Sequence, residues 1–316
     1  MDRLSHGTHH DMESQLLKFL ISAQNSDGGW GYFPGKHSAL EPTAYALMAL
    51  RQKPGIDGVL GKSRQFITVS QSRHGGWPVR GKEIDGASWV TPLVGLAVLA
   101  ANGETKQTQI AVEFVLSTFG TMPRSWSNRL AEWLGNSTSN VTTSLGGWSW
   151  NPGTATWVEP TCYALLFLKK TGHLVRGQRP IHVVDEAEAM VYDRMCRKGG
   201  WNYGNAQVLG EELRPYPLTT ALALIALQEN HGRLENQKSL DYLKQSVHSE
   251  KSVLSLSFAA LCFDVYAQDW QHVWEKVEES YQETLFLQDI KTAALMLMVL
   301  DARNADNFFR LKPEQG

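Results

Sequence analysis

A Gly-Gly-Trp turn followed by a Glu-Pro-Thr tripeptide occurs twice in this chain, and this duplication constrains the fold more than any other feature. The first copy joins Gly28-Gly29-Trp30 to Glu41-Pro42-Thr43, and the second joins Gly146-Gly147-Trp148 to Glu159-Pro160-Thr161. An almost wholly apolar segment follows the tripeptide in both copies. Two copies of the same turn, acid and apolar segment indicate that the chain is built from internal repeats.

Four further apolar segments extend the series to six. Weaker copies of the turn, Gly75-Gly76-Trp77 and Gly199-Gly200-Trp201, precede two of them. The other two segments, around 255–267 and 289–300, lack the turn. We therefore expect six strongly apolar inner helices, which begin at or near residues 41, 90, 159, 217, 255 and 289.

An amphipathic segment precedes each apolar one, as Leu16, Leu17 and Leu20 show in the first repeat. Later segments of this kind are expected at 108–118, 185–196, 238–247 and 272–284. A helix that is apolar on every side must be covered on every side, whereas an amphipathic helix needs only one buried face. The sequence therefore predicts an all-α fold, an α6/α6 toroid (α/α barrel) of six helical hairpins, with the starts of the parallel inner helices at one mouth.

The proposed domain organisation has three parts. Residues 1–11 are polar and rich in histidine, and we expect a disordered tail there. Residues 12–316 form a single toroid domain, which carries an insertion at 119–145 before the third Gly-Gly-Trp turn. Apolar residues of the insertion fall on one face of a short helix, which either packs on the barrel side or serves as a lid, a membrane-surface foot or a contact for a protein partner.

Charge and cysteine usage exclude several classes of function. A net charge of -2 and a pI near 6.6 provide no basic field, so we expect no nucleic-acid partner. The three cysteines have no paired spacing, which favours reduced thiols in a cytoplasmic protein. No signal peptide or membrane-spanning run is present, so a membrane contact would be peripheral and made through 119–145.

The segments Gln24-Asn-Ser-Asp-Gly28-Gly29-Trp30 and Gln71-Ser-Arg-His-Gly75-Gly76-Trp77 resemble the Gln-Trp repeats of the terpenoid cyclase and protein prenyltransferase superfamily. The resemblance covers roughly residues 12 to 305 and implies an α6/α6 toroid with a central apolar cavity. An isoprenoid or another apolar small molecule is the ligand that the resemblance implies.

Class II members of that superfamily protonate an alkene or epoxide from an Asp-x-Asp-Asp motif that precedes Thr-Ala. In register with this motif, Ala39 replaces the first acid, Glu41 stands at the proton-donating position and Pro42 replaces the last acid. Glu159 is the single acid of the corresponding segment in the third repeat. The resemblance thus implies a proton-initiated cyclisation or isomerisation with Glu41 and Glu159 as catalytic candidates. The alternative is that both are helix-start residues before a proline, which bind backbone amides.

The protein prenyltransferase β subunits of the superfamily hold zinc with a histidine and an Asp-x-Cys pair. Pro160 replaces that histidine before Thr161-Cys162-Tyr163, and no Asp-x-Cys occurs in the chain. We therefore expect neither a metal nor a cofactor. A non-catalytic toroid that binds a lipid or a protein, and a prenyltransferase β-like subunit without zinc, remain as alternatives to a cyclase or isomerase.

The tryptophans divide into two groups. Those of the Gly-Gly-Trp turns are expected to clamp outer helices onto inner ones. Aromatic residues near the mouth are candidates to line a cavity, where their faces stabilise cationic intermediates. The predicted cavity residues are Tyr45, Trp89, Trp150, Trp157, Tyr163, Tyr216 and Asp289.

Overall fold

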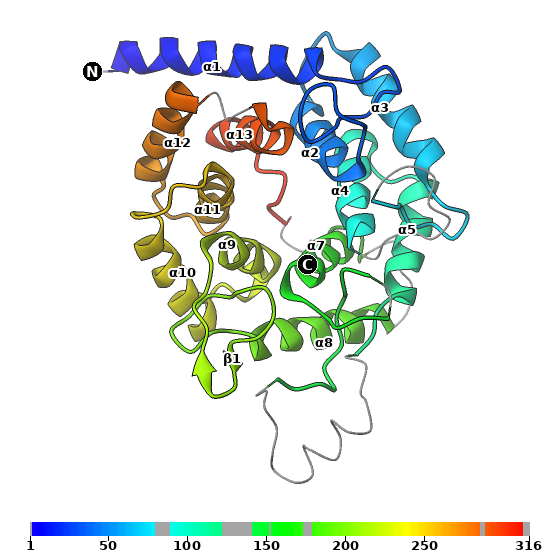
Figure 1. Cartoon of the computed structure of the whole chain (residues 1–316), viewed down its shortest axis with the longest axis vertical. Helices are drawn as coiled ribbons and strands as arrows, with labels where there is room; N and C mark the ends of the chain where they lie inside the picture. The colour runs from blue at the N-terminus through cyan, green and yellow to red at the C-terminus, as the bar shows by residue number, and fades with distance from the viewer. Residues whose placement is uncertain are drawn as a thin grey trace, which may run out of the picture.

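Two concentric layers of helices form the molecule (Figure 1). The computed structural model describes residues 2–79, 89–121, 141–151, 153–172, 179–284 and 288–311. The inner layer consists of α2 (Leu40–Leu50), α4 (Val90–Asn102), α7 (Val158–Lys170), α9 (Pro217–Ala226), α11 (Val253–Val265) and α13 (Ile290–Arg303). The outer layer consists of α1 (Asp2–Ser22), α3 (Asp57–Ser70), α5 (Lys106–Ser117), α8 (Arg179–Asp193), α10 (Leu234–Ser246) and α12 (Gln271–Thr284). The predicted α6/α6 toroid is confirmed.

The inner helices close into a ring, because each packs against the next and α13 packs against α2. Their observed starts at 40, 90, 158, 217, 253 and 290 confirm the starts predicted from the apolar segments. Every residue of α2 is buried, whereas α12 buries Val273, Trp274 and Val277 and exposes residues between them. The apolar segments thus form the inner layer, where they are covered on every side, and the amphipathic segments form the outer layer, where only one face is buried.

One hydrogen-bonding device joins each Gly-Gly-Trp turn to both layers. The backbone N–H of Trp30 donates to Thr43 Oγ1 of α2 at 2.9 Å, and its indole N–H donates to the Leu20 carbonyl of α1 at 2.7 Å. The backbone N–H of Trp77, Trp148 and Trp201 donates likewise to Thr91, Thr161 and Thr220, and their indole N–H groups donate to Ile67, Val115 and Val191. The expectation that these tryptophans clamp the two layers together is confirmed.

The first glycine of the turn is required by its backbone conformation and by a close approach. Gly28 has φ +91°, and a Cβ built there would lie 2.3 Å from the carbonyl oxygen of Lys62 on α3. Gln24 fixes the same junction, because its side-chain amide donates to the carbonyls of Gly28 and Val59. The glutamine and glycine of the repeat therefore set how one hairpin packs on the next.

A C-terminal segment, residues 304–311, crosses the end of the ring at which the inner helices finish (Figure 1). Phe309 is fully buried there and stacks on Phe258 of α11, with ring centroids 6.2 Å apart. Arg51, after α2, forms an ion pair with Asp306, and Arg310 pairs with Asp264. We call this closed end the base of the toroid.

Helix α1 begins at Asp2, where a disordered tail over residues 1–11 was expected. Most of the insertion, residues 122–140, lies outside the described residues, so its roles and the proposed domain boundaries stay predictions. A small hairpin, β1 (Gln207–Val208) with β2 (Glu211–Glu212), and a 3-10 turn, η2 (Gln228–Asn230), complete the described elements. Within these elements, no helix is both long and apolar enough to cross a membrane.

Candidate active site at the mouth of the toroid

The two Glu-Pro-Thr repeats place a glutamate and a tyrosine at equivalent positions on α2 and α7. Glu41 and Tyr45 are four residues apart on α2, and Glu159 and Tyr163 have the same spacing on α7. Residues four apart lie on one face of a helix. The two tyrosine hydroxyls meet at 2.5 Å, although both side chains are fully buried. The structure therefore brings the two repeats together at the centre of the ring.

Lys291, in the first turn of α13, forms an ion pair with the first of these glutamates. Its Nζ lies 2.6 Å from Glu41 Oε1 and 5.1 Å from the centroid of the Tyr45 ring. The side chains of Lys291 and Glu41 are only 14% and 11% exposed, so solvent screens the pair weakly. Lysine is electrostatically disfavoured at the start of a helix, where the backbone N–H groups are unpaired. Its place there therefore depends on the acid.

Tyr32 completes the surroundings of Glu41. Its hydroxyl donates to Glu41 Oε2 at 2.6 Å, and its backbone carbonyl accepts from the N–H of Ile290 at 3.0 Å. The loop after the first Gly-Gly-Trp turn thus holds both Glu41 and the start of α13. Both carboxylate oxygens are occupied by these side chains, so the hydrogen bonds of Glu41 go to Lys291 and Tyr32 rather than to backbone amides.

Burial shapes the ionisation of the whole cluster. It raises the pKa of Glu159 above the ordinary value, and the nearby Lys291 ammonium only partly opposes this while Glu41 reinforces it. Burial likewise raises the pKa of Tyr45 and of Tyr163. For Lys291, burial acts to lower the pKa, but Tyr45, Glu41 and Glu159 together hold it above the ordinary value. The cluster therefore contains an ammonium and one carboxyl, that of Glu159, which loses its proton less readily than an ordinary glutamate.

The other predicted cavity residues lie at the starts of the inner helices. Trp89 precedes α4 and packs edge-on against Trp150, with centroids 5.1 Å apart. Trp157 precedes α7 and contacts Gly204 so closely that an added Cβ would lie 2.8 Å from its ring. Tyr216 precedes α9, where Tyr203 lies 5.3 Å from it. Asp289 is the N-cap of α13, because its side chain accepts from the Thr292 N–H.

Sequence reasoning did not single out Lys291 or Tyr32. Lys291 could have been noticed as the single charged residue among the apolar residues that open α13, and Tyr32 as the tyrosine two residues after the turn tryptophan. Ring closure, which sets α13 beside α2, brings Lys291 to Glu41, whereas Tyr32 reaches Glu41 within the first repeat.

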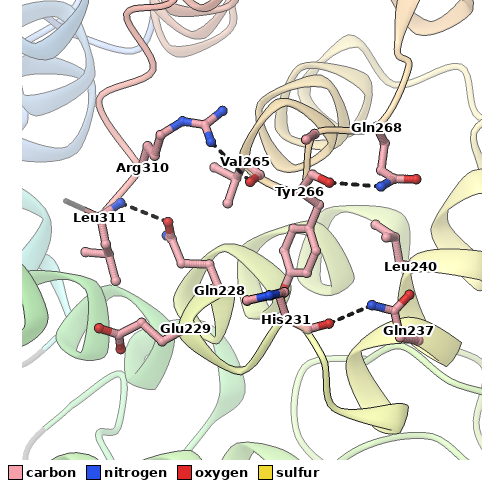
Figure 2. A pocket seen from close by; sticks show the side chains of 11 residues that line it. Gln228, Glu229, His231, Gln237, Leu240, Val265, Tyr266, Gln268, Arg310 and Leu311 are labelled. Atoms are coloured by element: carbon pink, nitrogen blue, oxygen red, sulfur yellow. Dashed lines mark hydrogen bonds between the residues drawn. The ribbon is translucent and has the colours of Figure 1, made fainter. Parts of the chain in front are cut away.

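Below this cluster, aromatic rings fill the middle of the ring. Phe258 meets Tyr45 edge-on at 6.4 Å and stacks on Phe309 from the C-terminal segment. At the base, a cavity of about 990 Å³ lies between the ends of α9 and α11, and Gln228, Arg310 and Leu311 are among its lining residues (Figure 2). The described residues thus place the acids and the base cavity at opposite ends of the inner helices.

The cysteine of the Thr161-Cys162-Tyr163 segment is a poor metal ligand. Cys162 is fully buried on α7, and burial raises the pKa of its thiol, which disfavours the thiolate that zinc requires. Across the described ranges, no group of three or more His, Cys, Asp or Glu side chains is arranged to hold a metal ion.

Comparison with solved structures places this geometry in a known fold. A type II terpene cyclase, MstE from Scytonema, in complex with merosterolic acid A superposes with a TM-score of 0.61 over 95% of this chain and 98% of the cyclase, at 12% sequence identity. The chain has the α/α-toroid fold of the type II terpene cyclases. An α-1,6-mannanase from Salegentibacter superposes with a TM-score of 0.57 over 94% of this chain and 99% of that one, at 14% identity. The terpene cyclase-like toroid is thus shared with enzymes of another class, and the fold alone does not determine the activity.

Sequence comparison agrees with the terpenoid cyclase-like superfamily over a short segment. Drimenyl diphosphate synthase from Streptantibioticus cattleyicolor is 38% identical over 66 residues, which are 21% of this chain and 12% of the synthase. An uncharacterized protein of Bradyrhizobium diazoefficiens is 36% identical over 69 residues, 22% of this chain and 13% of that protein. The matches therefore span only a small part of the length of these relatives. No protein-family model matches the sequence.

Proposed function

We propose that the toroid binds an isoprenoid or another apolar small molecule at its mouth and that Glu159 donates the proton that starts a cyclisation or isomerisation. The observation that carries this proposal is the environment of Glu159, whose pKa is raised by burial. A general acid must hold its proton until the substrate is in place, and a partly buried carboxyl with a raised pKa meets this need. MstE, which shares the fold, is described in complex with the substrate geranylgeranyl dihydroxybenzoate, and this supports an isoprenoid ligand.

The chemistry is a proton transfer followed by rearrangement. The O–H bond of Glu159 breaks, a C–H bond forms at one alkene carbon, and the other carbon becomes cationic. Attack by a second alkene on this cation closes a ring and moves the positive charge to that alkene. Loss of a proton from the carbon beside the final cation to the Glu159 carboxylate forms a double bond and restores the acid; without ring closure, the same loss shifts the original double bond. Trp89, Trp150, Trp157 and Tyr216, which stand at the mouth, supply aromatic faces that stabilise cationic intermediates.

Glu41 has a different role in this proposal. Lys291 and Tyr32 both bind its carboxyl group, so its two oxygens are already held by partners within the protein. Glu41 is therefore the counter-ion of the cluster, and the acid of the third repeat performs the proton transfer.

The test compares Glu159→Gln and Glu41→Gln with the wild-type protein. Squalene and linear prenyl diphosphates are the substrates, and cyclised or isomerised products are measured by mass spectrometry. Glu159→Gln is expected to lower turnover by about 100-fold or more, because glutamine has no carboxyl proton to donate. Glu113→Gln, on the exposed face of α5, is the matched control and should turn over at the wild-type rate. Undiminished turnover in Glu159→Gln would refute the assignment.

A second candidate function, a toroid that binds a lipid without catalysis, is favoured by the ion pair of Glu41. The residue in register with the proton donor of class II cyclases is neutralised by Lys291 in this chain. This candidate predicts a bound lipid in native mass spectrometry of protein purified from its own host and no product from any substrate.

A further inference from the structure

We propose that Lys291 is a positioning residue that assigns the acid role to Glu159, although the repeats place Glu41 and Glu159 in equivalent backbone positions. This inference rests on the function proposed above, because it concerns the proton donor of that reaction. Its test, however, has a readout that does not depend on turnover.

The two glutamates start from the same local frame. Thr43 Oγ1 and Thr161 Oγ1 each lie 2.7 Å from the backbone oxygen four residues earlier, and they accept from the turn tryptophans at 2.9 and 3.0 Å. Each glutamate precedes its threonine by two residues and its tyrosine by four. The backbone therefore gives no reason for one carboxyl to differ from the other, and the difference must come from neighbouring elements.

The neighbouring elements differ at two corresponding positions. Two residues after the turn tryptophan, the first repeat has Tyr32, which bonds Glu41, whereas the third repeat has Trp150. The inner helix that precedes α2 in the ring, α13, brings Lys291, whereas the helix that precedes α7, α4, begins after Trp89. Trp89 and Trp150 pack against each other. Where Glu41 has the Tyr32 phenol and the Lys291 ammonium beside it, the corresponding positions of the third repeat and of α4 thus carry two indoles.

The two carboxyls therefore differ in their surroundings. Glu41 bonds an ammonium and a phenolic O–H, whereas burial raises the pKa of Glu159. Among the described residues, the charged groups that act on Glu159 are Lys291 of α13 and Glu41 of α2. On the two helices beside α7, the first turns begin Val90-Thr91 and Pro217-Leu218 and carry no charge, and Arg214, before α9, lies over the Tyr216 ring.

The position of Lys291 relative to Glu41 has a direct consequence. With Lys291 in place, Glu41 is engaged in an ion pair at 2.6 Å, and its charge in turn favours the proton on Glu159. Without the ammonium, two carboxyls at equivalent backbone positions would share the available proton. The acid role would then no longer belong to Glu159 alone.

Infrared difference spectroscopy across a pH titration tests this inference, because a protonated carboxyl has a C=O stretch that an ionised one lacks. Wild-type protein is compared with Glu159→Gln, Glu41→Gln, Lys291→Met, Lys291→Arg and the double variant K291M/E159Q. We expect the C=O band that the wild-type protein owes to protonated Glu159 to be absent from Glu159→Gln. The double variant should regain a carboxyl signal, now from Glu41, and Lys291→Arg, which keeps the charge, should titrate like wild type.

Glu41→Gln provides a second measurement that leaves Lys291 intact, should the Lys291→Met variants fail to fold. Removal of Glu41 frees the ammonium to act on Glu159 alone, so the titration midpoint of Glu159 should move to lower pH. Loss of the Glu41 charge contributes to this shift, so Glu41→Gln is compared with the double variant E41Q/K291Q, in which the ammonium is also absent and the midpoint should lie at higher pH. A merely structural Lys291 would give these two variants the same midpoint. Equal midpoints in the two, or a folded K291M/E159Q without a carboxyl signal, would overturn the inference.

Turnover separates the inference from the proposed function. If the reaction occurs, K291M/E159Q should turn over at least about tenfold faster than Glu159→Gln, because Glu41 can then act as a general acid. If no variant, including wild type, yields product while the infrared signals behave as expected, the proposed reaction is refuted and the role of Lys291 in setting protonation is supported.

Discussion

The hydroxyl oxygens of Tyr45 and Tyr163 lie 2.5 Å apart at the centre of the ring, although 118 positions separate them in the chain. Each side chain is fully buried. Each stands one helical turn below a glutamate of the mouth. The contact fixes α2 relative to α7, two helices that are separated in the ring by α4.

The losses in the free energy of unfolding that follow removal of the Tyr45 and Tyr163 hydroxyls should not be additive. Tyr45→Phe and Tyr163→Phe each leave the other hydroxyl buried without its partner, which costs on the order of 1 to 3 kcal/mol. The double variant removes the stranded group as well, so its loss should be smaller than the sum of the two single losses. Urea unfolding of the four proteins measures this coupling. Strictly additive losses would show that the hydroxyls do not interact.

The pH dependence of stability should report Glu159. Burial holds its pKa in the folded protein above that of the unfolded chain, so folding takes up a proton in the interval between the two values. The free energy of unfolding attributable to this residue is therefore highest below the unfolded pKa and falls as the pH rises through the folded pKa. The difference between wild type and Glu159→Gln, measured by thermal unfolding from pH 4 upward, should show this decline. A difference that does not change with pH would contradict it.

The threonines that receive the turn tryptophans should be sensitive to loss of their hydroxyl. Thr161→Val keeps the shape of the side chain but leaves the buried N–H of Trp148 without its acceptor, and this should cost about 1 to 3 kcal/mol. Thr161→Ser keeps the hydroxyl and should restore most of the loss. Thr68→Val, on an exposed part of α3, is the matched control. Chemical denaturation decides the order of these variants, and equal losses in all three would exclude the hydrogen bond as the cause.

The C-terminal segment should contribute strongly to stability through Phe309. Phe309→Ala removes a fully buried ring that stacks on Phe258, and such a substitution costs about 3 to 5 kcal/mol. Phe33→Ala, at a partly exposed loop position, should cost less than about 1 kcal/mol. A similar loss for both variants, measured by denaturant unfolding, would mean that the segment does not hold the base together.

The fold could be predicted from the sequence because short, local residue patterns determine its helices and turns. Apolar segments such as that after Glu159 predict inner helices, and the turn glycines and tryptophans predict the links between layers. The threonines of the same motif belong to the pattern, but their role as acceptors for Trp30 and Trp148 depends on three-dimensional contacts. A pattern can mark a residue without showing the atom that it binds.

The site was predicted in part, and the missing part depends on contacts between distant repeats. Glu41 and Glu159 could be aligned because both follow a Gly-Gly-Trp turn. Lys291 could not, because the repeat of α13 lacks that turn and offers no register. The segment that contains Phe309 has no periodicity at all, and its contacts with η2 and α11 arise only when the ring has closed.

Ring closure also has a consequence for synthesis of the chain on the ribosome. The flank of α2 that α13 covers stays exposed until the last inner helix has been made, and ion pairs such as Lys53 with Asp301 span 248 residues. In an open array of hairpins each new repeat packs on the repeat before it, but here the packing of the first hairpin is complete only after the last one has been made. The nascent protein therefore presents two apolar flanks for most of its elongation, and a chain that stops before α13 would offer both flanks to another molecule, as a route to exchange of hairpins between copies.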